Sequence, residues 1–66
     1  MTTKDYDYTN DKGYHKRLTV HFPMDKNGTY FCSLWSRDTG NCCGTGHCTK
    51  KEINEILQHY GLTADF

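Results

Sequence analysis

The sequence predicts a small α+β domain in which an antiparallel β-hairpin is packed by one C-terminal α-helix. Apolar residues alternate with polar ones in residues 14–22 and recur through residues 30–36, which is typical of strands. In residues 50–60 they recur instead at the spacing of a helix. A hairpin alone is barely stable, so the helix must cover one of its faces, and a third short strand could extend the sheet.

The first 13 residues carry no helical or strand pattern, and we expect a flexible N-terminal arm there. Residues 14–66 would then form a single ββα domain. The arm is polar and acidic, and chain ends are usually loose unless they are tied down. Tyr6 and Tyr8 lie in this arm, and an alternative is that they dock on a partner protein.

The hairpin is predicted from two runs and the turn between them. In the first run, Leu18, Val20 and Phe22 alternate with polar residues, and a proline directly afterwards ends the strand because it has no N–H to donate. Asn27-Gly28 is a strong turn signal, since both residues tolerate a positive φ.

The second run carries bulky side chains on both faces of the predicted strand. Tyr30, Cys32 and Leu34 share the face expected to meet the helix. Phe31 and Trp35 share the opposite face.

The helix has a start, an apolar face and a stop that agree. Thr49 and Glu52 fit the capping box, in which each side chain bonds the other residue's backbone N–H. Gly61 stands where a left-handed residue often ends a helix. The predicted core consists of Leu18, Val20, Phe22, Tyr30, Leu34, Ile53, Ile56, Leu57 and Tyr60.

Cysteines and one histidine gather in residues 37–49, which are otherwise predicted to form a glycine-bearing loop. The candidate metal ligands are Cys32, Cys42, Cys43, His47 and Cys48. A structural zinc would take four such ligands and would stabilise a chain too short for a large core. The spacing matches no common zinc pattern, however, so free thiols, core cysteines and disulfides remain alternatives.

The outer face of the hairpin combines aromatic residues with basic ones, and the alternative is that a loop or the N-terminal arm covers the aromatic residues. This pattern suits contact with another protein or, alternatively, with single-stranded nucleic acid. The candidate partner-binding residues are Phe31, Trp35, Arg37, Arg17 and His21, together with Tyr6 and Tyr8 of the arm.

Composition narrows the function classes. The chain has 66 residues, and its 8 basic and 8 acidic residues give no net charge, which argues against a dedicated nucleic-acid binder. A chain this short rarely encloses a substrate pocket, so we do not expect an enzyme. With no signal peptide and no long apolar run, we expect a cytoplasmic protein without membrane contact.

The favoured hypothesis is therefore a non-enzymatic modulator that binds another protein as an inhibitor or adaptor, with zinc as a possible stabilising ion. Small proteins of this type are made by phages and mobile elements, among others. The alternative hypothesis is a zinc-finger-like protein that binds nucleic acid. Either could also form oligomers.

Overall fold

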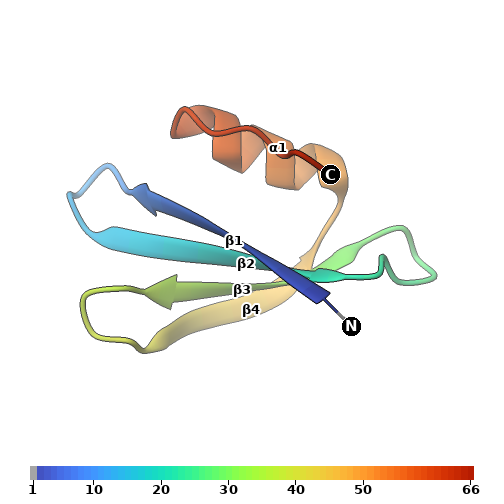
Figure 1. The fold of residues 1–66 in the computed structure, drawn as a ribbon, viewed down its shortest axis with the longest axis horizontal. Coiled ribbons are helices and arrows are strands. Elements are labelled where there is room, and N and C mark those ends of the chain that lie inside the picture. Colours follow the sequence, from blue (N-terminus) through green and yellow to red (C-terminus); the bar gives the residue numbers. More distant parts are fainter. Residues whose placement is uncertain (1) are drawn as a thin grey trace.

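The computed structural model describes residues 2–66 and confirms an α+β domain with a single C-terminal helix. Four strands, rather than the two or three predicted, form one antiparallel sheet in the order β1-β2-β3-β4. Helix α1 lies over one face of this sheet (Figure 1). The elements are β1 (Thr2–Thr9), β2 (His15–Phe22), β3 (Tyr30–Ser36), β4 (Cys42–Cys48) and α1 (Lys50–His59).

The predicted arm is in fact a strand, so the division of the chain at residue 13 was wrong. Strand β1 pairs with β2 along its whole length, with Tyr6 opposite Leu18. The Tyr6 side chain is buried, and the Tyr8 ring stacks on Tyr60 at 4.2 Å between centroids. Because tyrosines alternate with aspartates along β1, both rings point toward α1, and they anchor this segment in the core. Met1 lies outside the described residues.

The predicted loop before the helix contains strand β4. Its residues pair antiparallel with β3, with an irregularity between Leu34 and Trp35. Glycine has a low preference for strands, so composition alone did not indicate this one. Strand β3 supplies the backbone hydrogen bonds that hold this segment extended in spite of its low strand preference.

The turn between β2 and β3 forms as the sequence predicted. Gly28 has a φ of +81°, a conformation that favours glycine. Asp25 fixes this turn, because its carboxylate accepts hydrogen bonds from the backbone N–H groups of Asn27 and Thr29. It also accepts one from the Thr29 hydroxyl at 2.6 Å.

Helix α1 begins at the predicted residue and ends at His59, one residue before the predicted end. Both hydrogen bonds of the capping box form between Thr49 and Glu52, and Gly61 has a φ of +77°. Ile53 and Leu57 are fully buried against the sheet. Ile56, predicted to be buried, is 37 % exposed, because it faces the glycines of β4 and finds no side chain there.

The core lies between α1 and the sheet and is small. Its buried members are Tyr6, Leu18, Val20, Cys32, Ile53 and Leu57. Of the other predicted core residues, Phe22, Tyr30, Leu34 and Tyr60 are half-buried. No helix of residues 2–66 has the length and apolar character needed to cross a membrane.

The C-terminal tail closes one end of this core. After Gly61 the chain turns back and runs along α1 toward its first turn (Figure 1). The Phe66 ring meets those of Phe22 and Tyr30 edge-on, at 4.9 and 5.1 Å. Asp65 binds β1 by accepting hydrogen bonds from the Lys4 ammonium group and, at 2.7 Å, from the Tyr6 hydroxyl.

Candidate functional site

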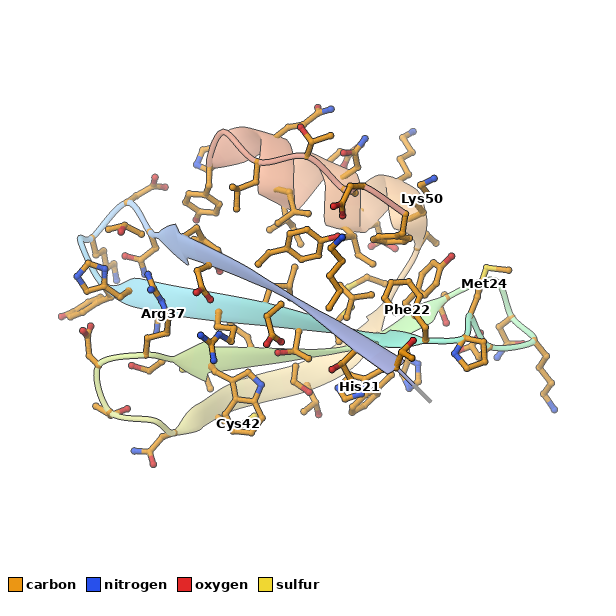
Figure 2. All side chains as sticks on the ribbon, viewed as in Figure 1. His21, Phe22, Met24, Arg37, Cys42 and Lys50 are labelled. Atoms are coloured by element: carbon orange, nitrogen blue, oxygen red, sulfur yellow. The ribbon has the colours of Figure 1, made fainter. Side chains whose placement is uncertain are left out.

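The side of the sheet away from α1 is the most distinctive surface of the molecule. We call it the open face, because within residues 2–66 no helix lies over it (Figure 1). In Figure 2, His21 and Cys42 lie on this side. The side chains that strand alternation directs to the open face include Asp5, Asp7, Arg17, Thr19, His21, Phe31, Ser33, Trp35 and His47, and Arg37 joins them from the end of β3.

An ion pair lies at one end of the open face. The Arg17 guanidinium donates through Nε to Asp7 Oδ1 at 2.7 Å, and Arg37 Nη1 lies 3.7 Å from Asp7 Oδ2. The hydrogen bond from Arg17 is the main reason why the pKa of Asp7 falls below its ordinary value. Trp35 lies opposite Arg17 in the register, so the ring and the two guanidinium groups share one region.

A row of aromatic rings crosses the other end of the open face. The rings of His21 and Phe31 meet edge-on at 5.1 Å, and those of Phe31 and His47 at 5.4 Å. The His47 ring also contacts Asp25, whose carboxylate lies 3.3 Å from Nδ1. Phe31 is 39 % exposed and Trp35 37 %, so two large rings of β3 present apolar area to solvent.

A shallow groove of about 470 Å³ runs between these two ends. It is open along its length and combines apolar ring surface with arginine, hydroxyl and carboxylate groups. Its lining consists of Asp5, Arg17, Thr19, His21, Ser33, Trp35, Ser36, Arg37 and Gly40. Such a groove can accept a protruding side chain or an extended segment of a partner.

One pair of groups in the groove has the composition of a nucleophile and its base. Ser33 Oγ lies 3.4 Å from His21 Nε2. Ser33 is only 5 % exposed, however, and among residues 2–66 no carboxylate forms an ion pair with His21 to orient its ring. The pair forms a hydrogen bond within the lining of the groove.

Five of the predicted partner-binding residues come together on the open face: Phe31, Trp35, Arg37, Arg17 and His21. Tyr6 and Tyr8 do not, because β1 directs their side chains to the opposite side, under α1. The free arm in which they were predicted to lie is strand β1, paired with β2. The sequence analysis missed Asp7, whose charge opposite Arg17 becomes visible only once β1 is recognised as a strand.

The candidate metal ligands lie on both faces of the sheet. Cys32 and Cys48 are on the side of α1, whereas Cys42 lies opposite Trp35 in the register and belongs to the open side. His47 is on the open face as well. Among residues 2–66 no three histidine, cysteine or acidic side chains come together as a metal site.

Zinc binding therefore remains a prediction, tested by native mass spectrometry of the chain in excess zinc. One bound zinc with four unmodified thiols would support it, and a bare chain would contradict it.

The four cysteines are unpaired and differ in their surroundings. Burial, with a smaller contribution from neighbouring Cys48, raises the pKa of Cys32 to about 12. This thiol is an apolar part of the core and not a reactive group. Cys43, by contrast, is exposed and accepts a hydrogen bond from the Lys16 ammonium group at 3.4 Å.

Comparison of the chain with known protein families, with curated proteins and with solved structures finds no match.

Proposed function

We propose that the chain is a small non-enzymatic protein that binds another protein through its open face and modulates it, as an inhibitor or an adaptor does. The observation that carries this proposal is the exposure of Phe31 and Trp35 beside Arg17 and Arg37 on an uncovered sheet. Tryptophan and arginine are the residues that contribute most often to the energetic centre of protein interfaces.

The charges of the open face favour a protein over a nucleic acid as the partner. Asp7 already neutralises Arg17 and lies near Arg37, and Asp5 adds a second carboxylate to the groove. Affinity for nucleic acid comes mainly from positive charges that are free to meet phosphates. A protein surface can instead match a mixture of rings and paired charges.

The test is affinity capture from the source cells, followed by binding measurements with the purified partner. Trp35→Ala should weaken binding by about 30-fold or more, which corresponds to about 2 kcal/mol, the usual loss at such an interface centre. Lys51→Ala is the matched control, because Lys51 is exposed on the helix, on the other side of the molecule. Circular dichroism verifies that both variants keep the fold.

Unchanged binding by a folded Trp35→Ala variant would refute the assignment of the open face. Binding to oligonucleotides that weakens steeply with salt would instead support the nucleic-acid alternative. We also propose a cytoplasmic location, since free thiols persist in a reducing compartment.

A further inference from the structure

The two edges of the sheet differ in how they are protected against pairing with another strand. The β1 edge carries Lys4, Asp5 and Asp7, and charged side chains are a common device against edge-to-edge association. Strand β4 contains no lysine, arginine, acidic residue or proline. Its one protective feature is the irregularity at its Cys42 end, which leaves residues 44–48 in regular pairing. Within residues 2–66 no strand pairs with the outer side of β4, so this edge can accept a further strand.

An apolar groove of about 310 Å³ lies directly beside this edge, between α1 and the sheet. Its walls include Leu34 of β3 and the half-exposed Ile56 of α1, and part of its floor is formed by Gly44 and Gly46. A methyl group added at either glycine would meet nothing within 4 Å. The groove is thus open above β4, and the helix leaves apolar surface uncovered there.

The regularly paired part of β4 is symmetric around Thr45, because Gly44 and Gly46 flank it. Two antiparallel copies of such a strand place each residue opposite its symmetric counterpart. We propose that β4 pairs with β4 of a second copy of this chain, around a two-fold axis near Thr45, to form a homodimer with one continuous sheet.

This pairing joins the two apolar grooves. A two-fold axis perpendicular to the sheet keeps both α1 helices on the same side, so each Ile56 borders a shared apolar channel. Gly44 of one copy lies opposite Gly46 of the other, and the absence of side chains there leaves room for the isoleucines. The dimer would bury the apolar surface that α1 leaves exposed in one copy.

Two features select a second copy over an unrelated peptide as the occupant. In an isologous contact both copies present the same strand, so the glycines beside Thr45 meet glycines of the second copy and keep the groove open, which a peptide from another protein would not ensure. The absence of lysine, arginine and acidic residues from β4 also means that two copies meet without repulsion between like charges. A core of this size gains from such an association. The proposal is independent of the proposed function, because the open face remains accessible in the dimer.

The experiment is sedimentation equilibrium of the full chain under reducing conditions, at concentrations up to about 1 mM, where even weak association is detected. We expect a mass rising from 7.7 kDa to twice that value. Thr45→Lys places two ammonium groups face to face at the axis and should weaken the dimer by about tenfold or more. Thr3→Lys is the matched control, because Thr3 is an exposed position on the opposite edge, and it should leave the dimer intact.

Ile56→Gln provides a second variant that leaves β4 itself unchanged. It should also weaken the dimer, and it leaves the strand pairing of β4 unchanged because Ile56 belongs to α1. A wild-type chain that stays monomeric over the whole concentration range would overturn the proposal. A dimer that Thr45→Lys and Ile56→Gln leave unchanged, or that Thr3→Lys weakens equally, would overturn it as well.

Discussion

Replacing Tyr6 by alanine tests whether β1 is an integral part of the fold. The side chain is only 7 % exposed and packs within the core between β2 and α1. Removing a buried aromatic ring costs about 3–5 kcal/mol, because the cavity is not refilled. A core of this size supplies only about 3–5 kcal/mol in total. We therefore expect Tyr6→Ala to be largely unfolded in water at 25 °C.

The assay is urea denaturation followed by far-ultraviolet circular dichroism. For a chain this small the free energy of unfolding falls by about 1 kcal/mol per molar urea, so the wild type should show a transition near 3–5 M. Tyr14→Ala is the matched control, since Tyr14 is 55 % exposed in the turn after β1, and its effect should stay within about 0.5 kcal/mol. A Tyr6→Ala transition within that same margin would refute the packing of β1, and residues 1–13 would then be the flexible arm that composition suggested.

Four further predictions follow from individual contacts. Burial raises the pKa of Tyr6 to about 12. The stability that the neutral Tyr6 hydroxyl contributes is therefore present below pH 10.0 and is lost as the pH rises toward 12. In the Tyr6→Phe variant, the melting temperature should no longer show this decrease at alkaline pH. The hydrogen bond from Lys4, with that from Tyr6, lowers the pKa of Asp65 below 3.8. The stability that the Asp65 carboxylate contributes is therefore present at neutral pH and is lost as the pH falls through the lowered pKa. Asp65→Asn should make the melting temperature depend less on pH in the acid range. Thr49→Ala should cost about 1 kcal/mol in urea denaturation, because it removes the helix cap. Iodoacetamide should modify buried Cys32 last among the four cysteines, as followed by peptide mass spectrometry; early modification would contradict its burial.

The parts of the fold that the sequence predicted are those specified by local chemistry. Thr49, Glu52 and Gly61 define the helix through hydrogen bonds and dihedral angles within a few residues. The turn at Gly28 is likewise local, since Asp25 and glycine suffice to form it. These features need no knowledge of the rest of the chain.

The two outer strands were missed because their pairing comes from non-local contacts. Strand β4 holds glycines, which intrinsic preference places in loops, and only the neighbouring β3 makes it a strand. Strand β1 carried a usable signal, since Tyr6 and Tyr8 alternate with aspartates, but this alternation was masked by the high polarity of the segment.

In the candidate site, too, the sequence predicted the features that depend on local pattern and missed those that depend on strand pairing. Phe31 and Trp35 share a face of one strand, as the period of two predicted, but whether another segment covers this face could not be read from the sequence. The contact between Asp7 and Arg17 depends on the register between β1 and β2, which composition does not reveal. The cysteines were grouped by nearness in the sequence, yet alternation along β4 and an irregularity in its pairing distribute them over both faces.

The most direct test of the open face as a binding surface is a titration of the isotope-labelled chain with its purified partner, followed by nuclear magnetic resonance. The account predicts that chemical shift changes concentrate on Arg17, Phe31 and Trp35. The signals of Glu55 and Gln58, on the exposed side of α1, should keep their chemical shifts. Changes concentrated on α1, with the signals of the open face unmoved, would contradict it.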